Sequence, residues 1–328
     1  MKKGKGPRLK FMLRLLGILS GILIGLLSCL GKGSETAPSK IDYEKVDALF
    51  GHDVSQLLFD HLYVVLDSVS YAQLTQRDSW GNTYGAMDKG LPDFAAIDKR
   101  TTSCYLRGHK HYIELLGPDN TYQEPIGKSG VGFSLQNSRE HFHLGVEPKL
   151  KQSGTPYLSI SETVDMPVGK QEATWFKAFY SPSEDTALHT WYAFYNPAFL
   201  DSLYPEKHPD YSREAFLRKS YKEEQLFEGI KNISLECTPK DYERIAQEMR
   251  HLGCNLLKKE GQTLTIASGD VTITITPSNA IAYSRILKIE CRLNTMDHSI
   301  TYLGNLIITN QGTESVWDFE GLYKNNIE

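Results

Sequence analysis

The sequence lacks the short motifs that carry much of the covalent and phosphate chemistry of proteins. It has no Gly-x-Ser-x-Gly segment and no Cys-x-x-Cys pair, which argues against a nucleophile elbow, a zinc ribbon and a thioredoxin-type centre. Residues 127–130, Gly-Lys-Ser-Gly, superficially resemble a phosphate loop, but the preceding glycine spacing and a following helix are missing. A function therefore has to rest on other residues.

The chain also lacks a basic stripe. Its 328 residues carry 36 Lys and Arg against 40 Asp and Glu, a formal net charge of −4. Residues 1–28 hold six of the positive charges and none of the negative ones, so the remainder has a formal net charge of −10. Such an acidic body repels phosphate backbones and anionic headgroups, which argues against nucleic acid as a partner.

Long apolar runs are scarce as well, and the one near the start indicates export. It extends from Leu15 to Leu27 after a basic segment and is shorter than the roughly 20 residues of a membrane-spanning helix. The sequence Leu-Leu-Ser-Cys at 26–29 resembles a bacterial lipobox, whose cysteine receives a diacylglycerol. We predict that residues 1–28 are a signal peptide and that Cys29 is lipidated; an uncleaved anchor helix is the alternative.

The segment after the cysteine predicts a tether. Residues 29–40 show no apolar periodicity and would link the lipid to a folded body at 41–328. Several acyl chains at one terminus anchor a protein much more firmly than a single chain does. Leu30 stands where an Asp would favour retention in the inner membrane. We therefore expect a protein of the cell envelope held at a membrane by lipid, with the outer membrane favoured.

Cysteine is scarce in the remaining body. An even number in an oxidising compartment permits disulfides, and four cysteines allow three pairings. Three of the four lie in strand-like segments, where a buried free cysteine is the commoner role. The pairing is left open among Cys104, Cys237, Cys254 and Cys291.

Two stretches share one order of predicted elements. Residues 230–294 have the pattern of a strand, a helix and three further strands, and residues 59–116 show a looser version. In the later stretch, Thr238 is a good N-cap, Pro239 suits the first helical position and Gly253 a terminator. We predict an α+β fold in which paired β-α-β-β-β modules form curved mixed sheets.

This arrangement makes two spatial predictions. The strands at 61–66 and 111–116 should lie side by side in one sheet. The helix at 238–252 should pack on the outside of the sheet formed by the later strands, and residues 295–320 should add C-terminal strands.

An aromatic-rich insertion at 136–229 separates the two modules. Its aromatic side chains can bury much surface, so we predict that it packs on the sheets and is ordered. Trp191 and Tyr195 are candidates for lining a ligand pocket, with core packing as the alternative.

Two segments carry a family resemblance. Residues 60–64 (Asp-His-Leu-Tyr-Val) and 112–116 (Tyr-Ile-Glu-Leu-Leu) resemble the first module of the vicinal oxygen chelate superfamily, which includes glyoxalases and extradiol dioxygenases. With residues 104–108, 130–133 and 191–197, their order is similar to a glyoxalase-like family common in Bacteroidota. The resemblance implies that His61 and Glu114 face a cupped sheet and hold a divalent metal.

The later module departs from that pattern. Residues 233–235 offer no His and residues 271–276 no Glu, so half of the usual ligand set is missing. His141 and His143, spaced to share one strand face, could complete the site or be exposed loop residues. The alternative for His61 is a buried, hydrogen-bonded histidine.

Two function classes therefore remain open. One is a lipoprotein that binds a small molecule or a protein without chemistry. The other is a metal-dependent enzyme of glyoxalase or dioxygenase type that polarises vicinal oxygens of a small substrate. The missing ligands favour the first.

The lipid anchor can be tested directly. Cys29→Ser removes the acceptor thiol, so we expect incorporation of labelled fatty acid to be abolished and the signal segment to remain on the chain. Fatty-acid labelling and an intact-mass measurement check this, with Cys254→Ser as the control. Normal labelling of the Cys29 variant would contradict the assignment.

Overall fold

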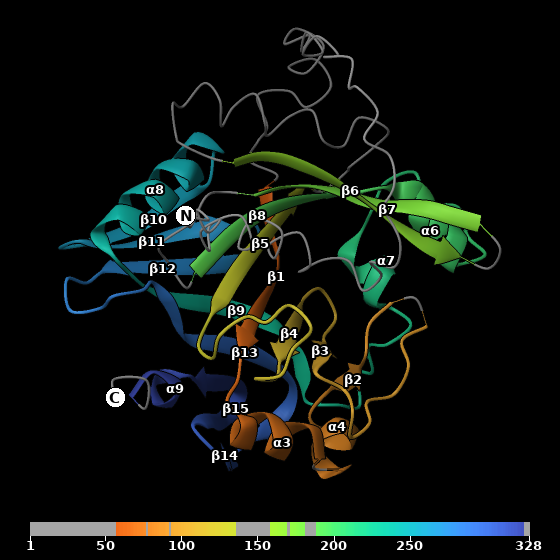
Figure 1. Cartoon of the computed structure of the whole chain (residues 1–328), viewed down its shortest axis with the longest axis horizontal. Coiled ribbons are helices and arrows are strands. Elements are labelled where there is room, and N and C mark those ends of the chain that lie inside the picture. The colour runs from red at the N-terminus through yellow and green to blue at the C-terminus, as the bar shows by residue number, and fades with distance from the viewer. Residues whose placement is uncertain are drawn as a thin grey trace, which may run out of the picture.

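The computed structural model in Figure 1 describes residues 57–76, 78–91, 93–135, 158–168, 171–180 and 188–324. The predicted signal segment, Cys29, His141 and His143 lie outside these residues. Within the described ranges, none of the helices has both the length and the apolar character needed to cross a membrane.

Eight strands form the first sheet, which we call sheet A, in the order β2-β3-β4-β1-β5-β8-β7-β6. Their bounds are β1 (Leu57–Val65), β2 (Ala86–Asp88), β3 (Ser103–Arg107), β4 (Tyr112–Leu116), β5 (Ser129–Leu135), β6 (Leu158–Val168), β7 (Gln171–Tyr180) and β8 (Leu188–Tyr195).

Seven strands form sheet B, in the order β10-β11-β12-β9-β13-β15-β14. Their bounds are β9 (Phe227–Cys237), β10 (Asn255–Glu260), β11 (Thr263–Ser268), β12 (Val271–Pro277), β13 (Arg285–Asp297), β14 (Ile300–Leu303) and β15 (Leu306–Asp318). The helices are α3 (Ser68–Gln76), α4 (Asp78–Thr83), α6 (Pro197–Leu203), α7 (Arg213–Leu217), α8 (Pro239–His251) and α9 (Glu320–Lys324).

The two sheets are mixed and share one connection pattern. The strand β1 pairs in parallel with β4 and antiparallel with β5, and β9 likewise pairs in parallel with β12 and antiparallel with β13. In sheet A the helices α3 and α4 follow β1, and in sheet B the helix α8 follows β9; in each case three strands come next, and the third of them pairs with that central strand. The α+β class and the mixed sheets are confirmed, as is the adjacency of the strands that contain His61 and Tyr112.

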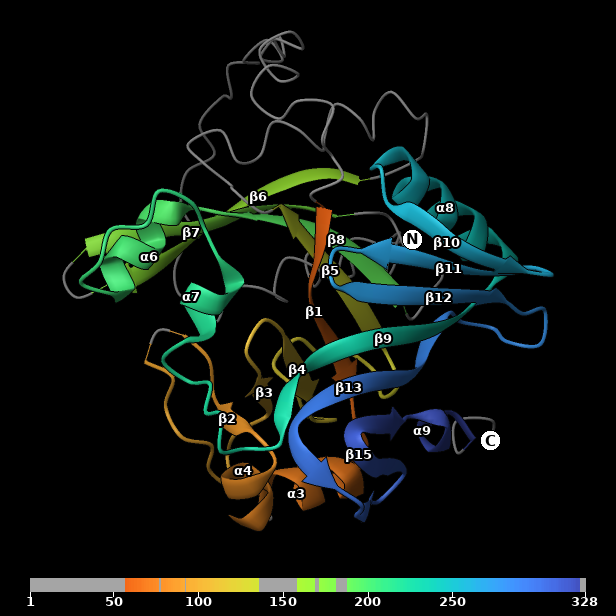
Figure 2. The same cartoon turned by 180° about the vertical axis from the view of Figure 1, so that it is seen from behind.

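One apolar core receives side chains from both sheets. Leu62 and Val64 of β1 meet Ile233 of β9 and Ile273 of β12 in it, and all four are almost fully buried. Sheet B lies in front of β1 and β5 in Figure 2. Because this core covers one face of β1 and a second cluster covers the other, the β-branched and aromatic residues of β1 are buried on both sides.

The helix α8 begins and ends as its sequence predicts. The Thr238 side chain accepts a hydrogen bond from the Asp241 amide, Pro239 is the first helical residue, and Gly253 follows the helix with φ of 79°. Its placement differs from our expectation. Arg244 and Glu248 bond to Thr190 and Tyr192 of β8, so α8 lies between sheet B and the neighbouring strand of sheet A and not on the outside.

The reason for this placement is a buried charge pair. Arg244 Nη1 lies 3.1 Å from Glu248 Oε1 and 2.8 Å from Thr190 Oγ1, and the Tyr192 hydroxyl donates to Glu248 at 2.8 Å. These side chains are almost fully buried. A buried ion pair is stable only when further hydrogen bonds satisfy it, and β8 supplies them.

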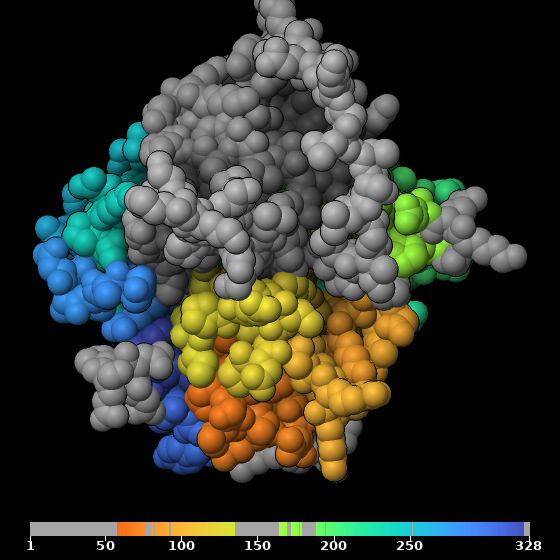
Figure 3. Space-filling model, viewed as in Figure 1, coloured from red at the N-terminus to blue at the C-terminus, as the bar shows by residue number. Residues whose placement is uncertain are grey.

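The second face of sheet A is covered by the insertion. Phe199 and Leu200 of α6 and Phe216 and Leu217 of α7 pack there against aromatic side chains of the sheet. The three strands β6, β7 and β8 extend the sheet itself. In Figure 3 the residues between β1 and β5, coloured orange to yellow, form one continuous part of the molecular surface.

The second face of sheet B is polar. In β11 and β12, buried Ile and Leu residues alternate with half-exposed Thr residues, the pattern of a sheet with one wet face. The four cysteines of the body are free, and Cys104, Cys237 and Cys291 are buried. Burial raises the pKa of the Cys104 and Cys237 thiols to about 12, so these thiols are inert at ordinary pH.

Candidate functional site

A β-bulge in the central strand β1 places two consecutive polar residues on one side of sheet A. Pairing of β1 with β5 is regular up to Phe59 and resumes at Leu62, with one extra residue in β1. A bulge of this kind re-aims side chains locally. Asp60 and His61 are thus able to bond to each other, with Asp60 Oδ2 2.6 Å from His61 Nδ1, although they are neighbours in a strand.

Asp60 is ionised in this setting. Burial alone would raise its pKa, but hydrogen bonds from His61 and from the Tyr195 hydroxyl, together with the charge of Arg213, lower the pKa below its ordinary value. The Tyr195 Oη–Asp60 Oδ2 distance is 2.5 Å. A carboxylate that accepts two such bonds is held firmly, and it fixes the orientation of the His61 ring.

His61 is buried among aromatic rings. Its ring stacks on Tyr112 with centroids 4.3 Å apart and meets the edge of Trp191 at 5.0 Å. The Trp191 ring lies close over Gly132 of β5, where any Cβ would overlap the indole. The absence of a side chain at that position therefore allows the Trp191 indole to lie close against β5, where it contacts His61.

The predicted partner Glu114 lies on the same face, one step along the neighbouring strand. Tyr112 is the register partner of His61, and Glu114 is the register partner of Tyr63. Burial raises the Glu114 pKa to about 7, against the lowering effects of a hydrogen bond from Tyr105 and of the Arg107 charge. The carboxyl group receives its bond from the Tyr105 hydroxyl at 3.0 Å.

Arg107 is enclosed close to this carboxyl. Its guanidinium makes two bonds to Asp88 and lies 4.9–5.7 Å from the ring centroids of the four aromatic residues that surround it. Those residues are Phe94, Tyr105, Tyr112 and Phe216. The Arg107 guanidinium is thus held by Asp88 and by the four aromatic rings. Among the contacts of the described chain, it makes no direct ion pair with Glu114.

His61 and Glu114 do not form a complete metal centre with their surroundings. The Asp60–His61 bond uses Nδ1 and leaves Nε2 as the ring nitrogen suited to a metal, which is a common second-sphere arrangement. Across the described ranges, however, no group of three His, Cys, Asp or Glu side chains could hold an ion. Two protein ligands are fewer than the three that catalytic zinc sites supply.

The two predicted pocket residues belong to this buried face. Trp191 and Tyr195 are 2% and 1% exposed, and Tyr195 stacks on Tyr211 with centroids 4.4 Å apart. The Trp191 Nε1 atom and the Tyr63 hydroxyl are buried without a hydrogen bond within the described structure. The side chains of Trp191 and Tyr195 thus pack in the core, and neither lines the cleft described next.

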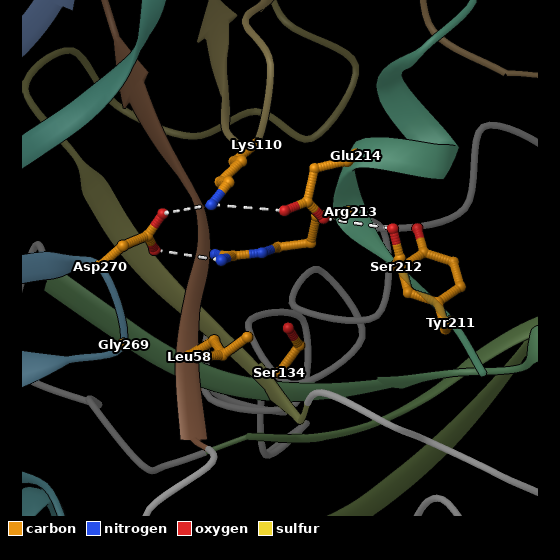
Figure 4. Close-up of a pocket in the computed structure, with 9 residues that line it drawn as sticks. All are labelled: Leu58, Lys110, Ser134, Tyr211, Ser212, Arg213, Glu214, Gly269 and Asp270. Atoms are coloured by element: carbon orange, nitrogen blue, oxygen red, sulfur yellow. Dashed lines mark hydrogen bonds and ion pairs between the residues drawn. The ribbon is translucent and has the colours of Figure 1, made fainter.

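A cleft of about 270 Å³ opens where the two sheets meet α7 (Figure 4). It is lined by Leu58, Lys110, Ser134, Tyr211, Ser212, Arg213, Glu214, Gly269 and Asp270. Sheet A supplies residues of β1, β5 and the β3–β4 turn, and sheet B supplies the two-residue turn between β11 and β12. Two cations and two carboxylates therefore share one small space.

The turn that carries Asp270 requires glycine at its first position. Gly269 has φ of 65°, and a Cβ there would overlap the Leu58 side chain of β1. Sheet B can therefore approach β1 closely at this point, and Asp270 reaches the residues of sheet A.

Asp270 is fixed through one oxygen only. Arg213 Nη2 donates to Oδ1 at 3.1 Å, and His111 Nε2 lies 3.3 Å from the same atom. The Ile230 amide donates to His111 Nδ1, so the ring proton sits on Nε2 and points at Asp270. Among the described residues, the Oδ2 atom has no hydrogen-bond partner. Burial acts to raise the Asp270 pKa, but His111 and Arg213 lower it well below its usual range, so Asp270 is ionised.

Lys110 spans the two carboxylates loosely. Its Nζ lies 3.5 Å from Glu214 Oε1 and 3.8 Å from Asp270 Oδ2, longer than a normal hydrogen bond. The Lys110 side chain is 41% exposed, whereas that of Arg213 is 10% exposed and also donates to the Phe59 carbonyl beside the bulge. Arg213 is thus held by direct hydrogen bonds, whereas Lys110 is the more exposed and the less closely bonded of the two cations.

The sequence predicts the residues of the first candidate site and does not predict those of the second. His61 and Glu114 were found through the resemblance, while Asp60 was overlooked because an alternating strand would place it on the opposite face from His61. Lys110, Arg213 and Asp270 are far apart in the sequence and match no motif. Only the Gly269-Asp270 turn between two strand-like segments gave a local signal.

The raised pKa of Glu114 predicts a pH-dependent stability. The folded state holds this proton more tightly than the unfolded chain, whose pKa is near 4.5, so the free energy of unfolding should fall as pH rises from about 4.5 to about 7. Glu114→Gln keeps an acceptor for Tyr105 and removes the charge. At pH 8 we expect the free energy of unfolding of the variant to exceed that of the wild type by on the order of 3 kcal/mol. At pH 4.5 the two free energies of unfolding should differ little.

Denaturant unfolding of both proteins across this pH range measures the difference. Glu260→Gln, at an exposed side chain, is the matched control and should change stability equally little at every pH. A Glu114→Gln effect that is the same at pH 4.5 and pH 8 would contradict the raised pKa.

Similar solved structures share only part of this architecture. A hypothetical protein from Staphylococcus aureus is 12% identical with a TM-score of 0.44, covering 70% of this chain and 88% of that one. A fusion of a xylose isomerase-like TIM barrel with 4-hydroxyphenylpyruvate dioxygenase is 11% identical with a TM-score of 0.37, covering 70% and 35%. A mutant of 4-hydroxymandelate synthase from Streptomyces coelicolor is 13% identical with a TM-score of 0.34, covering 71% and 69%.

At these scores the likenesses support no functional argument. A comparison with functionally curated proteins gave no match. The sequence itself matches a defined protein family over residues 59–319, which include both sheets except the first two residues of β1, and every cleft-lining residue except Leu58. The chain therefore belongs to the family of unknown function DUF5829.

Proposed function

We propose that this protein is a lipid-anchored envelope protein that binds a small polar ligand in the cleft between its two sheets. The N-terminal pattern supports the anchor, which would hold the body at a membrane, with the outer membrane favoured. The acidic body supports a partner other than nucleic acid. We further propose that the two strand-helix-strand units are degenerate glyoxalase-like modules, as the resemblance implies.

The observation that carries the proposal is the composition of the cleft. Four charged side chains, those of Lys110, Arg213, Glu214 and Asp270, line the cleft. Partial burial of charged groups costs free energy unless they are paired. We take their concentration around one cavity as the sign of a binding site for a polar ligand. The side chains of Lys110 and Glu214 remain about 40% exposed, so a ligand can reach them. A volume near 270 Å³ suits a molecule smaller than a typical drug-sized ligand.

The position of the cleft also supports binding. Its walls come from both sheets and from α7, and sites at such junctions are common among small-molecule binding proteins. Ligand contacts there would join Asp270 of sheet B to Lys110 of sheet A. Binding should therefore stabilise the association of the sheets and be visible in thermal unfolding.

Thermal unfolding with a panel of polar small molecules tests the proposal on the full-length protein in detergent. We expect at least one of the amino acids, sugars, carboxylates or nucleosides in the panel to raise the midpoint temperature of unfolding. Asp270→Asn should weaken the binding of that compound at least tenfold. Asp98→Asn makes the same change at an exposed ion pair outside the cleft and should bind normally. No stabilising compound, or equal binding by both variants, would contradict the cleft assignment.

One observation favours a second function, a metal-dependent enzyme of glyoxalase or dioxygenase type. Asp60 orients His61 through Nδ1 in the way that carboxylates orient metal-binding histidines, and Glu114 lies on the same face of the neighbouring strand. A bound divalent metal would polarise an oxygen of the substrate. The chain's own contribution would be to orient His61 and to exclude water with the surrounding aromatic rings.

Metal content separates the two functions. Because His61 and Glu114 lack a third ligand in the described ranges, we expect well below one divalent ion per chain in the full-length protein, measured by mass spectrometry of the elements. One ion per chain that is lost in His61→Ala, but kept in the control His109→Ala, would establish the metal enzyme instead.

A further inference from the structure

We propose that the cleft ligand is a zwitterion that carries a primary ammonium group and a carboxylate, with a free α-amino acid as the simplest example. This inference rests on the proposed function and names the class of ligand. It follows from the bonding of Asp270, the loose position of Lys110 and the charge balance of the cleft.

The first step concerns the unused oxygen of Asp270. Oδ1 is bonded to Arg213 and His111, whereas Oδ2 faces Lys110 Nζ at 3.8 Å and makes no hydrogen bond to the described part of the chain. A buried carboxylate oxygen without a donor is costly, since its hydration has been lost without replacement. The partner that fits this oxygen is a donor, and a cationic donor such as an ammonium group bonds to an ionised carboxylate more strongly than a neutral donor does.

The second step concerns the group that now stands in its place. Lys110 Nζ lies between Asp270 and Glu214 but too far from either for a good hydrogen bond, as Figure 4 shows. A long flexible side chain can leave this position at low cost because its exposed part already contacts solvent. A ligand ammonium can approach both carboxylates more closely, since it is not tied to the β3–β4 turn.

The third step is charge balance. Lys110 and Arg213 offset Asp270 and Glu214, so the cleft is formally neutral. A ligand with net charge would leave an uncompensated charge in a partly buried space, which a neutral zwitterion avoids. When the ligand ammonium takes the place of Lys110 Nζ, the released lysine is free to pair with the ligand carboxylate.

Paired probes test this on the full-length protein in detergent. Binding of a pool of α-amino acids is compared with that of the corresponding 2-hydroxy acids, which replace only the ammonium by a hydroxyl. We expect at least one amino acid to bind at least tenfold more tightly than its hydroxy acid, by calorimetry. Glu214→Gln should weaken the binding of that amino acid severalfold, whereas Asp98→Asn should leave its affinity unchanged.

Lys110→Met gives a readout that a merely structural cleft would not produce. Propylamine carries the ammonium without the carboxylate, and it competes with Lys110 Nζ for the two carboxylates. Removal of the lysine should therefore increase the affinity for propylamine severalfold. The affinity for the amino acid should increase less, because the amino acid also loses the lysine that would pair with its carboxylate.

The outcomes also separate this inference from the proposed function. Suppose that sugars or hydroxy acids bind in an Asp270-dependent manner and that compounds with an ammonium group bind no more tightly. This result would contradict the zwitterion inference, and the proposed binding function would still hold. Unchanged propylamine binding in Lys110→Met would also overturn it. If no compound of either panel binds, the proposed function fails first, and this inference fails with it.

Discussion

The two-sided burial of β1 is the constraint on which the rest of the structure depends. Its apolar side chains contribute to the core shared by both sheets, yet the strand also carries Asp60 and His61 in the interior. Buried polar groups must be hydrogen-bonded, and an ordinary strand would point these two to opposite faces. The bulge brings both side chains to the aromatic face of sheet A, the face that carries Tyr112, Trp191 and Tyr195. There Asp60 bonds both to His61 and to the Tyr195 hydroxyl.

The bulge has a cost, and that cost links the two candidate sites. It interrupts the ladder between β1 and β5 and leaves the Phe59 carbonyl to a side-chain donor, Arg213. The same guanidinium bonds to Asp270 of sheet B and lowers the pKa of Asp60 by its charge. One arginine at the start of α7 thus completes the bulge, joins the sheets and supplies the inner wall of the cleft.

The sequence predicts the elements of this fold better than their spatial relations. Periodicity and capping residues indicate the strands of the later module and the helix from Pro239, because these signals are local. The position of α8 depends on Arg244 and Glu248, whose partners lie more than 50 residues away on β8. An amphipathic pattern shows that a helix has a buried face, but it does not show which sheet will provide hydrogen bonds to its charges.

The candidate sites follow the same division. His61 and Glu114 could be named because the short segments around them carry the family resemblance, and the parallel pairing of β1 with β4 places them on one face. The cleft could not be named, because Lys110, Arg213 and Asp270 come together only when the β3–β4 turn, α7 and the β11–β12 turn meet. Gly269 permits that meeting through its positive φ and its missing side chain, features that stabilise no element by themselves.

The contrast between the two sites indicates where exchange with solvent is feasible. On the aromatic face His61 and Glu114 are 2% exposed, so any guest would have to displace packed rings, with the loss of their contacts. In the cleft the Lys110 side chain is 41% exposed, and it lies beside an ionised Asp270 oxygen that has no hydrogen-bond donor among the described residues. A ligand there would have to displace one partly solvated side chain and no packed ring. A buried cluster of polar side chains and an open, charged cleft thus lie on one central strand, and Arg213 contacts both.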